Sequence, residues 1–268
     1  MTGEDSKVWL EDGVLTITIA TAANGCSLDA QGAAQGAQAL AQYSDRVGSV
    51  LLRGGGSNFC AGGDVRAFAT APERGTYLGD LADILHGLVR ALDATSVPII
   101  AGVQGWAAGA GMSLVCMADI ALGGPSTKLR PAYPSIGYTP DGGMSWTLPR
   151  IVGVGRAREI LLLDETLSSD EAARLGILSR LVDDDLVQTE ALRLARTIAV
   201  GPTSAYTGIK TLLSESRTRS LDEQLDAEAA SIIRAADSPA GREGVDAFVE
   251  KRRADFSSSP HSSSPQQP

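Results

Sequence analysis

The sequence is poor in the residues that build metal sites, disulfide frameworks and aromatic clusters. Its 268 residues include three cysteines, two histidines and only 4% aromatic residues. The cysteines, Cys26, Cys60 and Cys116, are odd in number and widely spaced, which argues against a disulfide framework and against a zinc site. We therefore expect no metal and three small, buried thiols.

Long apolar runs and an excess of basic charge are also missing. No run approaches the roughly 20 apolar residues that a membrane-spanning helix needs. The net charge is −9, and the basic residues are dispersed among acids, so there is no basic stripe that could follow a nucleic acid. The first residues lack the basic and apolar regions of a signal peptide. We expect a cytoplasmic protein with neither a nucleic-acid nor a membrane partner.

A repeated strand and helix pattern, followed by helices alone, organises the chain. Asp12-Gly13 joins two β-rich segments as a hairpin, and strand and helix patterns then alternate as far as Val182. Four further segments have helical spacing, namely residues 186–199, 203–215, 220–236 and 240–253. This order predicts an α/β core over residues 1–200 and a helical region over 201–256. The Ser/Pro/Gln-rich residues 257–268 have nothing to bury, and we expect a disordered tail there.

Two glycine-rich turns follow apolar strands and are candidates for a binding site. The first contains Gly62-Gly63, and the second runs from Gly105 to Gly111 and leads into an apolar helix, Met112 to Ala118. A strand, turn and helix in this order aim free backbone N–H groups and the positive end of the helix dipole at whatever lies in front. The second turn therefore predicts a site for developing negative charge. The first turn is not a phosphate-binding P-loop, because no Gly-Lys-Ser/Thr follows it.

A single carboxylate, Asp141, lies in the turn Pro140-Asp141-Gly142-Gly143. An aspartate in such a turn is often structural, and here it could cap a helix that begins near Gly143. It could equally face the substrate of the glycine turns. His86 has the same two interpretations, because it lies on an otherwise apolar helix, Tyr77 to Leu92, where a core histidine is the more common case.

In combination these motifs resemble the crotonase family, also called the enoyl-CoA hydratase/isomerase superfamily. The matching segments are residues 58–65, 98–119, 137–150 and 244–252. The resemblance implies an α/β fold in which a spiral of ββα units is followed by an all-helical C-terminal trimerisation region. The expected assembly is a homotrimer or a dimer of trimers. The substrate it implies is an acyl-CoA, with coenzyme A present as part of the thioester and no permanently bound cofactor.

The resemblance also assigns roles to single residues. It implies that the backbone N–H groups of Gly63 and Ala110 hold the thioester carbonyl as it becomes an enolate, because fixed donors stabilise such charge. It places Ala61, Gly63 and Lys251 along the coenzyme A. The family normally has an Asn before a Ser-Leu-Asp run, where this chain has Cys26, so the first contacts with coenzyme A differ.

The type of reaction depends on the side chains opposite the two donors. Hydratases of the family use two glutamates, whose positions correspond here to Ser113 and Tyr133, and neither can serve as a carboxylate base. Asp141 matches the aspartate of several isomerases, so the chain resembles isomerase-type members more closely than two-glutamate hydratases. One carboxylate can take a proton from one carbon and return it to another. We expect Asp141 to be catalytic and His86, Tyr133 and Trp146 to line the substrate pocket.

The favoured hypothesis is therefore an enoyl-CoA double-bond isomerase of fatty or aromatic acid metabolism. Three other enzymes of the family remain alternatives: a hydratase, an acyl-CoA hydrolase and an aromatic acyl-CoA dehalogenase. The dehalogenase carries Asp and His at the positions of Asp141 and His86, and its Asp attacks the ring. A coenzyme A thioester binder without activity is the non-enzymatic alternative.

Overall fold

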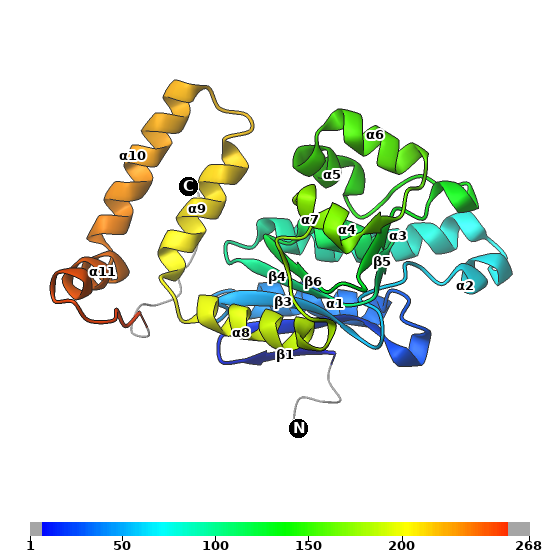
Figure 1. Ribbon diagram of the computed structural model, residues 1–268, viewed down its shortest axis with the longest axis horizontal. Helices are drawn as coiled ribbons and strands as arrows, with labels where there is room; N and C mark the ends of the chain where they lie inside the picture. Colours follow the sequence, from blue (N-terminus) through cyan, green and yellow to red (C-terminus); the bar gives the residue numbers. More distant parts are fainter. Residues whose placement is uncertain (1–6, 257–268) are drawn as a thin grey trace.

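A six-stranded sheet forms the centre of the molecule. The structure is a computed structural model that describes residues 7–256, so the predicted tail, residues 257–268, lies outside the described residues. The strand order is β1-β2-β3-β4-β6-β9, in which β1 is antiparallel to β2 and the other neighbours are parallel (Figure 1). The bounds are β1 Val8–Glu11, β2 Val14–Thr21, β3 Ser49–Gly55, β4 Ile99–Val103, β6 Ile120–Gly123 and β9 Arg180–Leu181. The predicted hairpin between β1 and β2 is confirmed.

A second, smaller sheet contains β5 (Trp106–Ala108), β7 (Lys128–Arg130) and β8 (Leu167–Ser168). The sequence predicted one glycine-rich turn where β5 lies, and that prediction is wrong for its middle part. β5 pairs in parallel with β7, and Ala107 also forms a bridge with Cys60. The backbone of these residues is therefore hydrogen-bonded on both sides, which keeps the chain extended until Gly109.

Helices cover both faces of the large sheet, and each face has its own core. On one face lie α1 (Ala30–Gln42) and α3 (Arg74–Ala94), whose Leu85, Leu88 and Leu92 are fully buried. On the other face lies α8 (Val187–Ala199). The second core joins strand residues to α8 and contains Val14, Leu51, Ile100, Leu122, Ala191, Ala195, Ile198 and Ala199. Alternate strand residues thus point into different cores, as the pleat requires.

Five further helices complete the described α/β part. They are α2 (Val65–Thr70), α4 (Ala110–Met117), α5 (Met144–Val152), α6 (Val154–Leu162) and α7 (Ser169–Arg174). Two of them, α4 and α7, contact the smaller sheet. Every residue of α4 except the last is buried, so this helix is covered on all sides. Its position in the middle of the molecule makes it the element that can hold a site rigidly.

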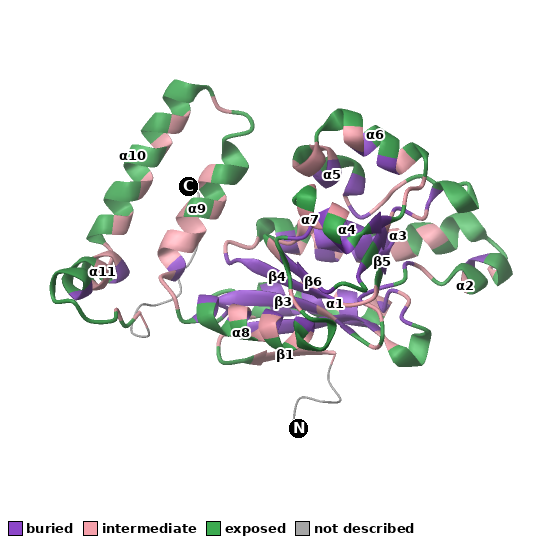
Figure 2. Ribbon diagram, in the orientation of Figure 1, coloured by how far each residue is buried: buried purple, intermediate pink, exposed green. Residues whose placement is uncertain are grey.

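The C-terminal helices extend away from the sheet. They are α9 (Thr203–Glu215), α10 (Leu221–Asp237) and α11 (Pro239–Val249), and α10 is largely exposed (Figures 1 and 2). Ser220 and Glu223 form a capping box at the start of α10. Lys210 anchors α9, because its Nζ donates to the Val97 carbonyl (3.0 Å) and pairs with Asp119 (2.8 Å). Among residues 7–256, no helix combines the length and the apolar character needed to cross a membrane.

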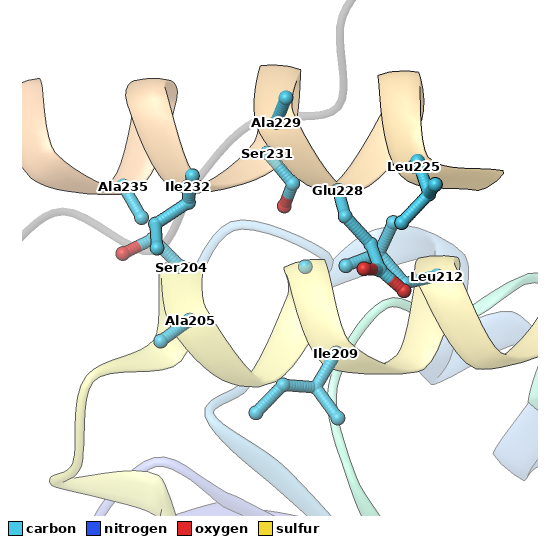
Figure 3. Close-up of a pocket in the computed structure, with 11 residues that line it drawn as sticks. Ser204, Ala205, Ile209, Leu212, Leu225, Glu228, Ala229, Ser231, Ile232 and Ala235 are labelled. Carbon is cyan, nitrogen blue, oxygen red and sulfur yellow. The ribbon is translucent and has the colours of Figure 1, made fainter. Parts of the chain in front are cut away.

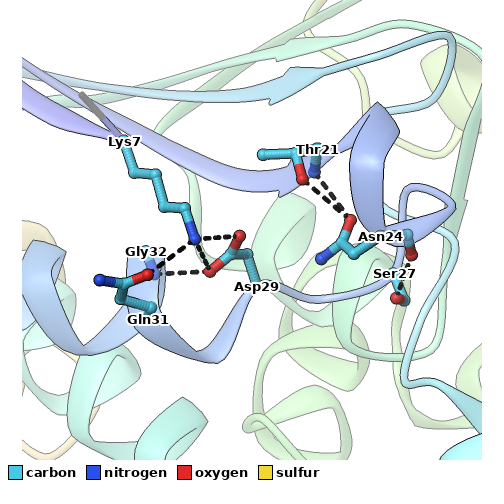
Figure 4. Close-up of polar contacts among 7 residues, drawn as sticks. All are labelled: Lys7, Thr21, Asn24, Ser27, Asp29, Gln31 and Gly32. Carbon is cyan, nitrogen blue, oxygen red and sulfur yellow. Dashed lines mark hydrogen bonds and ion pairs between the residues drawn. The ribbon is translucent and has the colours of Figure 1, made fainter. Parts of the chain in front are cut away.

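The segment before α1 is held by a local polar network (Figure 4). Asp29 caps α1 by accepting from the Gly32 N–H at 2.9 Å, and Lys7 forms an ion pair with the same carboxylate at 2.7 Å. The Cys26 carbonyl accepts a hydrogen bond from the Ala61 N–H at 2.7 Å. The capped start of α1 is thereby joined to the first glycine-rich turn.

Candidate active site

The two glycine-rich turns predicted from the sequence lie against each other. The Ala108 N–H donates to the Cys60 carbonyl at 2.9 Å. A Cβ added to Gly111 would lie 2.3 Å from that same carbonyl oxygen, and one added to Gly109 would lie 3.6 Å from the Gly62 Cα. Since real Cβ atoms do not come so close to a carbonyl oxygen as 2.3 Å, the contact between the turns requires glycine at position 111.

Backbone conformation adds a second requirement for glycine. Gly62 has φ 97° and Gly109 has φ 51° with ψ −121°, regions that side chains with a Cβ rarely adopt. Gly63 has an ordinary φ, but a Cβ there would lie 2.3 Å from the Phe68 ring, which is buried. Glycine at these positions therefore allows the backbone of both turns to adopt its observed conformation.

The predicted donors, Gly63 and Ala110, carry free N–H groups. Ala110 is the first residue of α4, and Gly63 immediately precedes Asp64, which caps α2 by accepting from the Arg66 and Ala67 N–H groups. Within residues 7–256, neither the Gly63 N–H nor the Ala110 N–H donates to another protein group. The first N–H groups of a helix have no partner within it, and they favour negative charge. The Gly63 and Ala110 N–H groups, on two turns that contact each other, are thus available to a ligand.

Asp141 bonds to a side chain and does not cap a helix. Its Oδ1 accepts a hydrogen bond of 2.7 Å from the Tyr133 hydroxyl. Gly143 is the residue at the start of α5, and no side chain caps that helix. The interpretation of Asp141 as a helix cap is therefore wrong, because its carboxylate is committed to Tyr133.

Tyr133 and Ser113 support Asp141 from two directions. Tyr133 is 8% exposed, and burial, followed by the negative charge of Asp141, raises the pKa of its hydroxyl well above the ordinary value. Tyr133 thus stays protonated and donates. The Ser113 hydroxyl, fully buried on α4, donates to the Asp141 carbonyl at 3.0 Å and lies 3.3 Å from the Tyr133 hydroxyl. Ser113 follows Ala110 by three residues, so one helix carries a free donor and a contact to the carboxylate residue.

His86 contacts the same turn from α3. Its Nε2 accepts a hydrogen bond of 3.2 Å from the Gly142 N–H. For this bond Nε2 must be unprotonated, so the ring proton of a neutral His86 lies on Nδ1. His86 holds the backbone of the turn and has no contact with the Asp141 carboxylate among the hydrogen bonds of the described residues.

Trp146 and Lys251 do not join this cluster. The guanidinium groups of Arg150 and Arg217 lie over the Trp146 ring, 4.0 and 4.7 Å from its centroid, and Trp146 lines a cleft of about 1340 Å³ bordered by α9 and α10. Lys251 is exposed and follows α11, which lies far from β5 and α4 (Figure 1). Ala61 is exposed beside Gly62. The structure thus brings together Tyr133, Asp141 and His86, while Trp146 and Lys251 lie elsewhere.

The sequence missed the shared role of Ser113 and Tyr133. Ser113 was noted only as a position without a carboxylate, and Tyr133 was expected to line the substrate pocket. The signal was present in the resemblance, because both positions carry glutamates in hydratases and so must face one point. Nothing in the sequence indicated that this point is Asp141.

A second hollow lies among the C-terminal helices. A hollow of about 510 Å³ lies between α9 and α10 and is lined mainly by small and apolar side chains, among them Ala205, Leu212 and Ala235 (Figure 3). It contains none of the predicted site residues. In the described part of the chain, no group of three or more His, Cys, Asp and Glu side chains is arranged to hold a metal ion.

Comparison with known proteins identifies relatives over nearly the whole chain. The family model for enoyl-CoA hydratase/isomerase matches residues 10–259. The chain is 36% identical to the 1,2-epoxyphenylacetyl-CoA isomerase of Escherichia coli, over 92% of this chain and 96% of the relative. It is 30% identical to a 4-chlorobenzoyl coenzyme A dehalogenase of an Arthrobacter species, over 90% of this chain and 88% of the relative.

Solved structures agree with these matches. The crystal structure of an enoyl-CoA hydratase from a Polaromonas species superimposes with a TM-score of 0.84 at 29% identity, covering 93% of this chain and 98% of that one. The predicted α/β fold with a helical C-terminal region is therefore confirmed.

Proposed function

This chain belongs to the enoyl-CoA hydratase/isomerase (crotonase) family, whose members act on coenzyme A thioesters, and on that premise we propose that it is an enoyl-CoA double-bond isomerase. One observation carries the proposal. A single carboxylate, Asp141, is held by Tyr133 at 2.7 Å, and the positions of the two hydratase glutamates are occupied by Ser113 and by Tyr133 itself. Among residues 7–256, these positions thus supply one base, Asp141, and no second carboxylate to activate water.

The chemistry follows from these groups. The thioester carbonyl binds to the N–H groups of Gly63 and Ala110, which are fixed before the reaction begins. Asp141 removes a proton from a carbon of the acyl chain, and the electrons move onto the carbonyl oxygen to form a dienolate. Returning the proton to another carbon shifts the double bond without changing the mass. One fixed donor of this kind contributes about 3 kcal/mol to stabilising the transition state.

The relatives support this order of preference. The isomerase from Escherichia coli is 36% identical to this chain, and the dehalogenase is 30% identical. A dehalogenase remains the second candidate because Asp141 and Gly142 form one turn, which His86 contacts. It would use Asp141 as a nucleophile on an aromatic ring and would release halide.

The test is the substitution Asp141→Asn, assayed with a panel of enoyl-CoAs in D₂O. We expect wild-type protein to yield an isomer that differs from the substrate only by exchanged deuterium, and the variant to lose a factor of about 10² to 10⁴ in turnover. Asp64→Asn is the matched control, since it makes the same chemical change and Asn still caps a helix.

Other outcomes of this assay would identify other activities. Unchanged turnover in Asp141→Asn would show that Asp141 is not the base. A product heavier by one water identifies a hydratase, free coenzyme A identifies a hydrolase, and halide release identifies a dehalogenase. Binding without deuterium exchange in the wild-type protein would indicate a coenzyme A thioester binder without activity.

The coenzyme A moiety is proposed to lie along Ala61 and Gly63, beside the segment that begins at Cys26. The hydrogen bond between the Ala61 N–H and the Cys26 carbonyl supports this path, because it joins the two segments. Lys251 is proposed to contact coenzyme A as well. Since Lys251 is remote from this path within one chain, that contact requires a second copy of the chain.

A homotrimer or a dimer of trimers is the assembly proposed. The C-terminal helices support it, because they expose large apolar side chains to solvent, including Leu213, Leu225, Ile232, Ile233, Val245 and Phe248. Apolar surface of this extent marks protein interfaces. Light scattering coupled to size exclusion tests the assembly, and a monomer across the working concentration range would refute it.

A further inference from the structure

The hydroxyl of Tyr133 has a defined task in the site. From its 2.7 Å contact with the Asp141 carboxylate we infer that Tyr133 is a positioning residue, which aims that carboxylate at the substrate. Ser113 is inferred to hold the backbone of the same residue. The inference rests on the proposed role of Asp141 as the base.

The direction of each hydrogen bond follows from counting protons. Tyr133 has one proton to donate, and its hydroxyl lies 2.7 Å from Asp141 Oδ1 and 3.3 Å from Ser113 Oγ. The shorter contact, to a charged acceptor, takes the proton. Ser113 Oγ lies 3.0 Å from the Asp141 carbonyl and 3.3 Å from the Gly109 carbonyl, which are both acceptors, so Ser113 donates to the backbone.

The other neighbours of the turn form hydrogen bonds with its backbone and not with the Asp141 carboxylate. His86 on α3 accepts from the Gly142 N–H, and the Met144 N–H at the start of α5 donates to the Asp141 carbonyl. Both contacts involve backbone atoms of the turn. Within residues 7–256, the Tyr133 hydroxyl is the only protein group that forms a hydrogen bond with the Asp141 carboxylate, and no ion pair reaches it. Removing this donor therefore acts on the carboxylate directly.

The packing of Tyr133 can be separated from its hydroxyl. The ring belongs to the large apolar core, so it contributes burial whether or not it carries a hydroxyl. Tyr133→Phe keeps the ring and removes only the donor. A purely structural role for the hydroxyl would alter stability and leave the pH dependence of the reaction unchanged.

This arrangement also explains how the site differs from that of a hydratase. Two positions that carry glutamates in hydratases here direct their hydroxyl groups to one aspartate, at its carboxylate and at its carbonyl. Neither hydroxyl group is a carboxylate that could activate water. Tyr133 and Ser113 thus determine which reaction the shared backbone donors promote.

The test compares pH profiles of kcat and kcat/KM for the full-length wild-type protein, Tyr133→Phe and Ser113→Ala. Tyr133→Phe removes the donor to the Asp141 carboxylate, so the acidic limb of the pH profile should move to higher pH. We expect kcat on the plateau to fall about tenfold, with KM within about twofold. Ser113→Ala should lower kcat without moving the limb, because Ser113 bonds to the backbone.

Two controls separate the possible results. Tyr43→Phe removes a hydroxyl at the end of α1, away from the site, and should change nothing. Replacing Tyr133 by a fluorinated tyrosine retains the packing and makes the hydroxyl a stronger donor, so the limb should move to lower pH. This variant tests the role of the Tyr133 hydroxyl even if Tyr133→Phe folds poorly.

The outcomes for Tyr133 and for Asp141 are distinct. If Asp141→Asn is inactive but neither substitution at Tyr133 moves the limb, the inference is overturned and the proposed function stands. If Asp141→Asn remains active, the proposed function fails and the inference fails with it. Opposite shifts in the two Tyr133 variants, with an inactive Asp141→Asn, support both.

Discussion

Replacing Gly111 by Ala tests whether contact between the two glycine-rich turns creates the anion site. Gly111 is in α4, where Ala is intrinsically the better helix former. The added Cβ would nevertheless lie 2.3 Å from the Cys60 carbonyl oxygen and 2.8 Å from the Cys60 Cβ. To restore normal contact distances, α4 and the first turn must separate by about 1 Å. That movement displaces the Ala110 N–H relative to the Gly63 N–H.

The size of the effect can be worked out against a matched glycine. Gly87 lies inside α3, and a Cβ added there meets nothing within 4 Å. Gly87→Ala should therefore stabilise the protein by about 0.5–1 kcal/mol through helix propensity alone. Overpacking at Gly111 should instead destabilise it by about 1–3 kcal/mol. Misplacing a catalytic group by about 1 Å can reduce the rate by roughly a hundredfold.

Thermal unfolding and steady-state kinetics measure the two consequences. At equal protein concentration, Gly87→Ala should raise Tm by about 1–4 °C and Gly111→Ala should lower it by about 2–12 °C. Deuterium exchange into the substrate should fall far more in Gly111→Ala than its stability loss explains. A Gly111→Ala protein with wild-type exchange would refute the idea that the turns must touch to bind the enolate.

Three further predictions concern a buried thiol, a helix cap and the anchor of α9. Burial raises the pKa of the Cys60 thiol from 9.0 to about 12, so the unfolded chain loses this proton at a lower pH than the folded protein does. The free energy of unfolding should therefore fall by about 1.4 kcal/mol per pH unit from about pH 9 to about pH 12, and Cys60→Ala should show a shallower fall over the same range. Asp64→Ala removes the cap of α2 and should cost about 1 kcal/mol while lowering kcat through Gly63, which chemical denaturation and kinetics can compare. Lys210→Ala removes the anchor of α9 at Asp119, so limited proteolysis between α8 and α9 should accelerate, and unchanged cleavage would argue against an anchoring role.

Local features of the fold could be predicted from the sequence because their causes are local. The Asp-Gly hairpin and the apolar face of α3 each depend on neighbouring residues, and the structure confirms both. β5 could not be predicted, because three residues form a strand only when remote partners, β7 and Cys60, supply the hydrogen bonds.

In the candidate site, too, locally determined features were predictable and contacts between remote residues were not. The two glycine-rich turns were predictable, since strand, turn and helix follow one another along the chain. The link between Tyr133 and Asp141 was not, because it depends on how the turn after β7 folds back over α4. The environment of Trp146 was also hidden, since Arg217 lies beyond α9 and reaches the ring only through the placement of the C-terminal helices.

The second core has a consequence for how the protein is made. Val14, Leu51, Ile100 and Leu122 belong to strands early in the chain, yet α8, which covers them, begins at Val187. During synthesis the ribosome releases these strands long before their cover exists. A nascent chain that stops short of α8 exposes one whole apolar face of the sheet, and such surfaces promote aggregation. The chain can therefore complete its sheet only after about three quarters of it has been translated, and chaperone binding should be strongest just before that point.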